Sequence, residues 1–267
     1  FVGTNSGFSN TTGANNVFMG PETGYLNTTG GYNIFIGYQS GYSNLIGQNN
    51  VFLGNLAGYA NTVSNNVFLG YESGRYNTLG TTNAFMGYQS GRSNTSGTSN
   101  VLIGNQAGYA NTTGGTNVFI GNTSGYANNI GASNVFLGNS AGYFNTASNN
   151  VFLGYESGYS NSSGVTNAFM GYQTGRGNTT GASNVFIGTQ AGYSNGAGNY
   201  NLFLGFTAGY ANTASNNVFL GFESGRFNST GTTNAFIGYQ TGRTNTTGSN
   251  NVFIGNQAGE LNVASAD

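Results

Sequence analysis

The chain has 267 residues, of which 48 are glycine and only 4% are charged, and its formal net charge is −1. It contains no cysteine, histidine or tryptophan, and its five basic residues are all arginine. We therefore expect no disulfide framework, no metal or other cofactor, and no nucleic-acid binding. The 14% of aromatic residues argues against a disordered chain, and no apolar run approaches the ~18 residues of a membrane-inserted helix.

A short apolar run ending in glycine recurs along the whole chain, as in residues 66–70, which read Asn-Val-Phe-Leu-Gly. This glycine, taken here as position 0 of each repeat, falls at residues 3, 20, 37, 54, 70, 87, 104, 121, 138, 154, 171, 188, 205, 221, 238 and 255. The spacing is 17 residues and shortens to 16 only after Gly54, Gly138 and Gly205. A fixed period this short is typical of a solenoid.

We therefore predict an all-β, parallel β-solenoid, or β-roll, of about sixteen 17-residue coils, forming an oligomeric rod or fibre. Residues 1–267 are interpreted as a single repeat domain. Because the chain begins inside a repeat and without methionine, we expect it to be a window of a longer or processed protein.

Several positions hardly vary from one repeat to the next. Position −4 is Asn, position −2 is Phe except at Leu102, position +4 is Gly, and position +7 is Asn. The pattern predicts a strand, a turn, a second strand and a second turn in each coil, with glycines at the corners. The three short repeats carry Ser64, Ser148 or Ser215 where the other repeats have a turn glycine, so this corner should tolerate a change in length.

Alternation along the strand places Asn, Phe and Gly on one face. We predict that the Phe column fills the coil interior, ring on ring, and that the Asn columns form amide ladders beside it. The predicted core ladder consists of Phe18, Phe35, Phe52, Phe68, Phe85, Phe119, Phe136, Phe152, Phe169, Phe186, Phe203, Phe219, Phe236 and Phe253.

Positions −3 and −1 lie on the opposite face and are also apolar, with aliphatic side chains. A strand that is apolar on both faces is normally covered on both, and soluble monomers rarely expose a large apolar stripe. We therefore predict a homo-oligomer packed along its length, with an interface that includes Val67, Leu69, Val118, Ile120, Val151, Leu153, Val218 and Leu220.

End-to-end assembly into filaments is an alternative, because an uncapped coil offers an unpaired strand edge. Glu260 and the loss of the turn glycine in residues 261–267 indicate some capping at the C-terminal end.

All five arginines occupy position +5, where most other repeats carry tyrosine. The interpretation that we favour is a solvated face on which each arginine packs over a neighbouring ring, worth about 1 kcal/mol. The functional alternative is an Arg/Tyr platform for host or matrix glycans, polyanions or a surface. Its candidate residues are Arg75, Arg92, Arg176, Arg226, Arg243, Tyr109, Tyr126 and Tyr143.

Catalytic chemistry is not expected. Glu22, Glu72, Glu156 and Glu223 share position +2 but are at least ~14 Å apart along a solenoid. That separation exceeds the roughly 5–9.5 Å of a glycosidase carboxylate pair, and no histidine or cysteine is present for a triad or a thiol nucleophile. Glycosylation motifs recur at one corner, as at Asn94, Asn178 and Asn245.

The repeats resemble the head repeats of YadA-type trimeric autotransporter adhesins and related repeats of bacterial surface and phage tail fibres. The matching piece is residues 100–107, Asn-Val-Leu-Ile-Gly-Asn-Gln-Ala, with its counterparts along the whole chain. The resemblance implies a trimeric, left-handed parallel β-roll displayed outside the cell that binds host or matrix surfaces. The 17-residue coil and the Phe and Tyr columns depart from the family's usual repeat.

We therefore expect an extracellular or cell-surface structural fibre or adhesin segment that attaches through many weak contacts. The alternative is an ice-binding β-solenoid that uses the Asn-Thr ladder. Its threonines, such as Thr62, Thr78, Thr95 and Thr112, lie at position +8, a column interrupted by Leu45, Asn129, Gly196 and Val263.

Overall fold

The computed structural model describes residues 1–262, in which short strands are joined by turns and no helix occurs. It is a parallel β-solenoid of about 14 turns with 17-residue coils. The strands are β1 (Val17–Met19), β2 (Ile34–Ile36), β3 (Val51–Leu53), β4 (Val67–Leu69), β5 (Ala84–Met86), β6 (Val101–Ile103), β7 (Val118–Ile120), β8 (Val135–Leu137), β9 (Val151–Leu153), β10 (Ala168–Met170), β11 (Val185–Ile187), β12 (Leu202–Leu204), β13 (Val218–Leu220), β14 (Ala235–Ile237) and β15 (Val252–Ile254).

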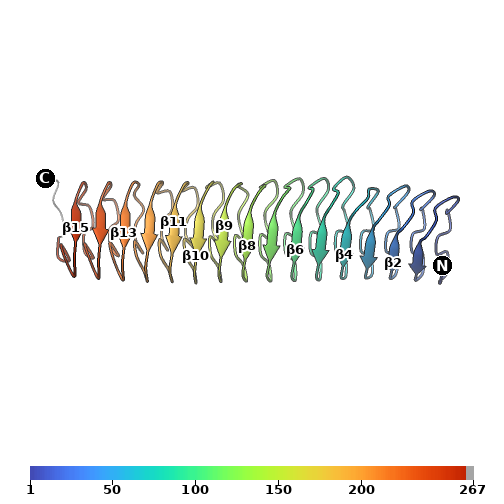
Figure 1. Ribbon diagram of the computed structural model, residues 1–267, viewed down its shortest axis with the longest axis horizontal. Coiled ribbons are helices and arrows are strands. Elements are labelled where there is room, and N and C mark those ends of the chain that lie inside the picture. The colour runs from blue at the N-terminus through green and yellow to red at the C-terminus, as the bar shows by residue number, and fades with distance from the viewer. Residues whose placement is uncertain (263–267) are drawn as a thin grey trace. The chain divides into compact units, whose positions relative to one another are not determined.

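Contacts divide the chain into two compact units, Phe1–Asn134 with β1 to β7 and Val135–Asp267 with β8 to β15. Within each unit, consecutive strands lie side by side and parallel (Figure 1). The predicted count of sixteen coils is not confirmed, because the run ending at Gly3 gives only an isolated bridge between Val2 and Met19. Within residues 1–262 no helix could cross a membrane. The capping residues 263–267 lie outside the described part.

The prediction of two strands per coil is wrong, because each coil has a single strand of three residues. After position 0 the backbone makes successive turns, with the Ser73 N–H donating to the Gly70 carbonyl (3.3 Å) and the Asn77 N–H to the Gly74 carbonyl (3.0 Å). The residue at position +2, such as Glu72, adopts a positive φ of 52°. Hydrogen bonds between coils continue along these turns even though the backbone is not extended there.

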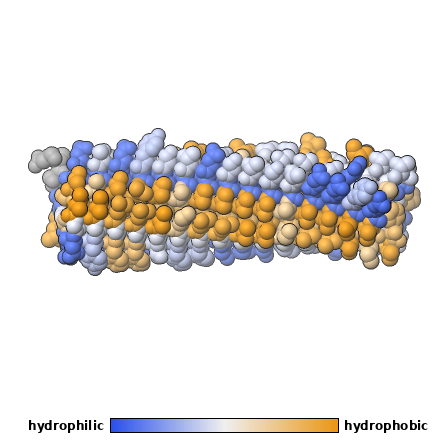
Figure 2. All heavy atoms as spheres, in the orientation of Figure 1, coloured by the Kyte–Doolittle hydropathy of each residue, from blue (hydrophilic) through white to orange (hydrophobic). Residues whose placement is uncertain are grey.

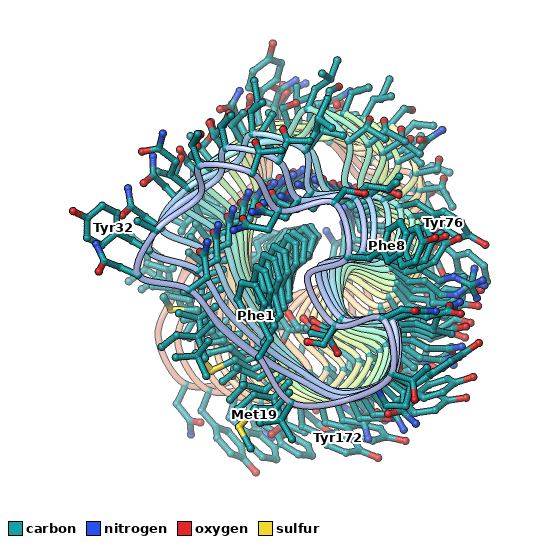
Figure 3. All side chains as sticks on the ribbon, turned by 90° about the vertical axis from the view of Figure 1, so that its right-hand side faces the viewer. Phe1, Phe8, Met19, Tyr32, Tyr76 and Tyr172 are labelled. Carbon is teal, nitrogen blue, oxygen red and sulfur yellow. The ribbon has the colours of Figure 1, made fainter. Side chains whose placement is uncertain are left out.

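The phenyl rings at position −2 lie inside the coils, and Figure 3 shows Phe1 within the coil while Met19 points outward. The rings from Phe18 to Phe236 have no exposed surface, and Phe253 is half-buried. In the second unit, the Phe219 ring stacks on the rings of its neighbours at centroid distances of 4.8 and 4.9 Å. Burial of each ring contributes about 1.5–3 kcal/mol.

The glycine at position +4 makes room for this ladder. A Cβ atom added at Gly225 would lie 2.5 Å from the Phe219 ring, and the φ of Gly225 is +58°. Both the space and the left-handed backbone therefore require glycine. This explains why position +4 does not vary along the chain.

The Asn column at position +7 forms the expected amide ladder inside the coil. The Asn94 side-chain nitrogen donates to the Oδ1 of Asn77 (2.6 Å) and to the carbonyl of Gly97 (3.0 Å). The Asn94 Oδ1 in turn accepts from the Nδ2 of Asn111 (2.8 Å). The Asn94 amide is thus satisfied by the coils before and after it, which removes the cost of burying it.

The Asn column at position −4 differs from the expected ladder, because its amides bond mainly to the backbone. The Asn83 Oδ1 accepts the backbone N–H of Asn100 (2.9 Å), and its Nδ2 donates across the coil to the Gly97 carbonyl (2.8 Å). A Cβ atom at Gly97 would lie 2.3 Å from the carbonyl oxygen of Gly114. The turn glycine is therefore required by the close approach of two coils.

The 16-residue repeats keep the strands in register, since Val51 pairs with Val67 across the first of them. At the shortened corner, the Asn61 side chain donates to the carbonyl of Val63, two residues on, at 2.7 Å. The Ser64 Oγ accepts the N–H of Gln48 at 2.9 Å. The deletion is thus absorbed within the corner.

We expect Phe219→Ala to lower the free energy of unfolding by about 3–5 kcal/mol, because a fully buried ring and two ring stacks are lost. Phe219→Leu is the matched control, since Leu102 occupies this column in another coil, and it should cost less than about 2 kcal/mol. Urea titration followed by far-UV circular dichroism measures both. Equal losses for the two variants would contradict an interior ladder.

We expect Asn94→Ala to lower the free energy of unfolding by about 2–4 kcal/mol, because it leaves the buried Asn77 Oδ1 without its donor. Thr95→Ala, which changes the neighbouring residue, should alter it by less than about 1 kcal/mol. Hydrogen exchange of the amides in the flanking coils should quicken only in the Asn94 variant. If the two variants behave alike, the ladder does not stabilise the coil.

Candidate functional site

An aliphatic stripe covers the outer face of the strands in each unit. It consists of positions −3 and −1, which are Val, Ile, Leu, Met or Ala in every strand. Figure 2 shows these side chains as an apolar band over the strands. At about 4.8 Å per strand, the stripe of the second unit extends for roughly 34 Å.

The residues predicted for an interface between copies all lie in this stripe. Ile120 is exposed, and the others are half-buried. Their partial burial comes from the neighbouring coils, which shield the flanks of each side chain. Their outer ends remain open on the face opposite the Phe column.

A second feature of the surface is a set of ion pairs between glutamates at position +2 and arginines at position +5, all within residues 1–262. We call these groups the Glu–Arg clusters. In the first unit, Glu72 binds Arg75 and Arg92. In the second unit, Glu156 binds Arg176. The third cluster, also in the second unit, joins Glu223 to Arg226 and Arg243.

The geometry of the first cluster shows how one carboxylate holds two guanidinium groups. One Glu72 oxygen accepts from the Nη1 of Arg75, while the other accepts from the Arg92 Nε at 2.6 Å and from the Gln89 side chain at 2.9 Å. The carboxylate lies between arginines of successive coils. It therefore offsets the repulsion that two adjacent arginines would otherwise have.

The clusters were missed by sequence reasoning, although the spacing holds a signal for them. Every arginine follows a glutamate by 3 or by 20 residues, that is, within one coil or in the next coil. Glu22, by contrast, accepts a hydrogen bond from Gln39 at 2.7 Å and has no arginine at either spacing. In a solenoid, such pairs must be sought across the repeat as well as along the chain.

The predicted Arg/Tyr platform lies along this column. The Arg92 guanidinium carbon is 4.9 Å from the ring centroid of Tyr76 and 5.7 Å from that of Tyr109. Tyr109 and Tyr126 stack at 5.2 Å, and Tyr143 stacks on Tyr159 at 5.2 Å. Because these rings lie face to face, their edges and hydroxyl groups, rather than their faces, are turned outward.

The aromatic residues at position +1 form a separate ladder. Tyr71 and Tyr88 stack at 5.4 Å, and Tyr155 and Tyr172 stack at 5.3 Å. Figure 3 shows Tyr172 pointing away from the coil. The rings that contact the arginines belong to positions +5 and +6 and not to this ladder.

The glycosylation motifs lie at buried asparagines. Asn94, Asn178 and Asn245 belong to the position +7 ladder and have no exposed surface. The Asn178 Nδ2, where a glycan would attach, already donates to the Asn161 Oδ1 (2.7 Å) and to the Gly181 carbonyl (3.0 Å). The folded coil therefore has no room for a glycan at these sites.

The threonines of the Asn-Thr ladder lie at a turn. The Thr95 hydroxyl donates to the carbonyl of Thr112 in the next coil at 3.1 Å, and Thr78 makes the same bond to Thr95. Their hydroxyl protons are thus committed to the backbone. The asparagine of each Asn-Thr pair points inward.

Within residues 1–262, neither unit has a pocket, and no group of three or more His, Cys, Asp or Glu side chains converges. The features that the described surface offers are therefore elongated: the aliphatic stripe, the aromatic ladders and the Glu–Arg clusters. Such surfaces suit extended partners rather than small molecules.

The pKa of the cluster carboxyl groups depends on two opposing effects. Burial alone would raise the pKa of Glu72, but hydrogen bonds from Arg92 and Gln89 and the charges of Arg92 and Arg75 hold it below 4.5, its ordinary value. The pKa of Glu223 is likewise lowered, with burial opposed by Gln240 and the two arginines. The ionised clusters therefore stabilise the fold.

A group with a lowered pKa stabilises the folded chain above its unfolded pKa and loses that effect as the pH falls through its folded pKa. We therefore expect the urea midpoint to fall as the pH drops below about 4.5, the ordinary value. The triple variant Glu72→Gln, Glu156→Gln and Glu223→Gln should show a flatter profile, with lower stability at neutral pH. Parallel profiles for the two proteins would contradict this role.

Comparison with protein-family models, with curated proteins and with solved structures finds no match for this chain. The resemblance to adhesin and fibre repeats therefore stays a prediction drawn from the repeat itself.

Proposed function

We propose that this chain is a structural segment of an extracellular fibre or adhesin, in which copies of the chain pack side by side through the aliphatic stripe. The observation that carries the proposal is the composition of the stripe. Every outward position of every strand is aliphatic, although the same face of the coil could accept polar residues at no cost to the interior. A second copy would remove these side chains from water.

The stripe fits a homotypic partner because of its regularity. The strands of each unit are in register, so the side chains at positions −3 and −1 form straight rows. Another copy presents rows with the same spacing, which allows contacts to repeat coil after coil. Small contributions from each coil then add up along the length of the contact.

The remaining surface supports a role in display. Coils that are hydrogen-bonded to both neighbours form a stiff support, and each outer column repeats one residue type along it. Weak contacts to a host or matrix surface, repeated along such a column, give high avidity without a strong single site. The proposed role of the chain is thus attachment outside the cell, without enzymatic activity.

Ice binding by the Asn-Thr ladder remains the alternative hypothesis. Its threonine hydroxyls donate to the backbone, and its asparagines are buried, so no specific observation favours it over lateral assembly. Thermal hysteresis of the purified chain tests it directly.

Sedimentation and native mass spectrometry test the proposal. We expect the unmodified chain to form a discrete oligomer. The variant Val151→Thr, Leu153→Thr, Val218→Thr and Leu220→Thr should shift it toward monomer, because threonine keeps the strand but makes the stripe polar. A decrease in self-affinity of at least about 100-fold is expected from four such changes.

The matched control replaces four apolar residues outside the stripe, namely Leu45, Ile46, Leu79 and Ile130, each with threonine. These side chains are 48% to 66% exposed, more than the four stripe residues that are changed. The control should keep the oligomer. A monomeric unmodified chain, or equal dissociation of both variants, would overturn the assignment of the stripe.

A further inference from the structure

We propose that the Glu–Arg clusters are binding sites for acidic polysaccharides, whose carboxylate or sulfate groups contact the outward edges of the arginines. The inference deepens the proposed function by naming the class of surface that the segment would attach to. It rests on the proposed function only for the avidity of an assembled fibre. Each cluster is formed within one chain, so a single chain should also bind. They do not overlap the aliphatic stripe, which occupies positions −3 and −1.

The clusters expose their positive groups and hide their negative ones. The Glu72 side chain is 6% exposed, whereas those of Arg75 and Arg92 are 25% and 20% exposed. In the third cluster, Glu223 is 9% exposed and each of its arginines is 29% exposed. Each of these two clusters holds two arginines and one glutamate. An approaching anion therefore meets positive charge, although the whole chain has a net charge of −1.

The arginines are also held in place before any ligand arrives. The Arg92 Nε is bonded to Glu72, its Nη1 contacts the Tyr109 hydroxyl at 3.3 Å, and its guanidinium lies between two rings. In the described part of the chain, these bonds engage two of its five N–H donors. A guanidinium group fixed in this way can pair with a carboxylate or a sulfate at a small entropic cost.

The neighbouring groups favour a sugar chain over other polyanions. The Tyr109 hydroxyl contacts an arginine, and the amides of Gln89 and Gln240 each donate one N–H to a cluster glutamate. The second N–H of each amide and the tyrosine hydroxyls can bond to sugar hydroxyls. In the second unit, Arg176 and Arg226 lie three coils apart, roughly 14 Å. Duplex DNA carries one charge per about 1.7 Å, so it would find too few cations here. Stacking of neutral sugars is also disfavoured, because the ring faces are occupied by neighbouring rings.

The test measures binding of the full chain to immobilised heparin and to polygalacturonate, with dextran as a neutral probe and duplex DNA as a competing polyanion. We expect binding to both acidic probes at low ionic strength and its loss as salt is added. The two probes distinguish sulfate from carboxylate recognition. Binding to dextran, or tighter binding to DNA than to both acidic polysaccharides, would overturn the proposal.

Two single variants separate cluster charge from net charge. Glu72→Gln removes the carboxylate between two arginines, whereas Glu22→Gln removes one that accepts a hydrogen bond from Gln39 and has no arginine 3 or 20 residues further along the chain. Both change the net charge equally. We expect affinity for the acidic probes to rise by roughly three- to tenfold with Glu72→Gln, because the amide oxygen can still accept an arginine hydrogen bond while the opposing negative charge is gone, and to change little with Glu22→Gln. Equal effects would indicate only a general charge effect and would overturn the site.

A third variant removes all the clusters with residues that the chain itself uses at these positions. Each cluster glutamate becomes Gln and each arginine becomes Tyr, as in the coil that carries Gln106 and Tyr109. This variant should fold, as circular dichroism can verify, and should lose binding to both acidic probes. Retained binding would overturn the proposal.

The stripe variant separates this inference from the proposed function. A monomeric stripe variant should keep its binding per chain when it is measured in solution. An unmodified chain that is monomeric but binds the acidic probes would contradict the fibre proposal alone, whereas an unmodified chain that is oligomeric but does not bind them would contradict this inference alone.

Discussion

The hydrogen-bonded stacking of one coil on the next is the constraint from which the rest of each unit follows. Backbone donors that a single coil cannot satisfy are satisfied by its neighbours, both at the strand and along the turns. Because the register is fixed, each position of the repeat becomes a straight column. A residue type therefore acts through its column, as the buried Phe rings and Asn amides do, and a single coil has no comparable stability of its own.

Columns also explain how so few kinds of residue make distinct surfaces. The same three-residue strand turns a Phe inward and two aliphatic side chains outward. The turns that follow place aromatic rings and, in some coils, charged groups on the outside. A replacement at one position thus changes one surface and leaves the others intact, so the aliphatic stripe and the charged columns can vary independently.

Much of the architecture was accessible from the sequence because the repeat samples each position many times. The 17-residue period predicted a solenoid fold. Phe at position −2 indicated the interior of the coil, since alternation along the strand separates it from its aliphatic neighbours. The second strand was predicted wrongly because its residues are ambiguous. A run such as residues 70–77 contains turn formers, and the positive φ at Glu72 depends on stacking that local preference does not show.

The Glu–Arg clusters could not be found by searching for neighbours along the chain alone. Two of the five ion pairs join residues three apart, but the others join residues 20 apart, and only the known coil length relates those positions. The backbone bonds of Asn83 were missed for a similar reason. The sequence specifies an inward amide, whereas the orientation of its oxygen and nitrogen depends on the adjacent turn.

The shortened corners have a consequence for how the chain finds its own alignment. Successive coils are so alike that a looped-out coil, or one borrowed from another molecule, would meet nearly the same partners as the correct one. The irregular places, such as Ser64 in its 16-residue repeat and Leu102 among the rings, break this translational symmetry. These irregular positions make the correct alignment of coils lower in energy than any shifted alignment. A perfectly uniform repeat would lack this energy difference.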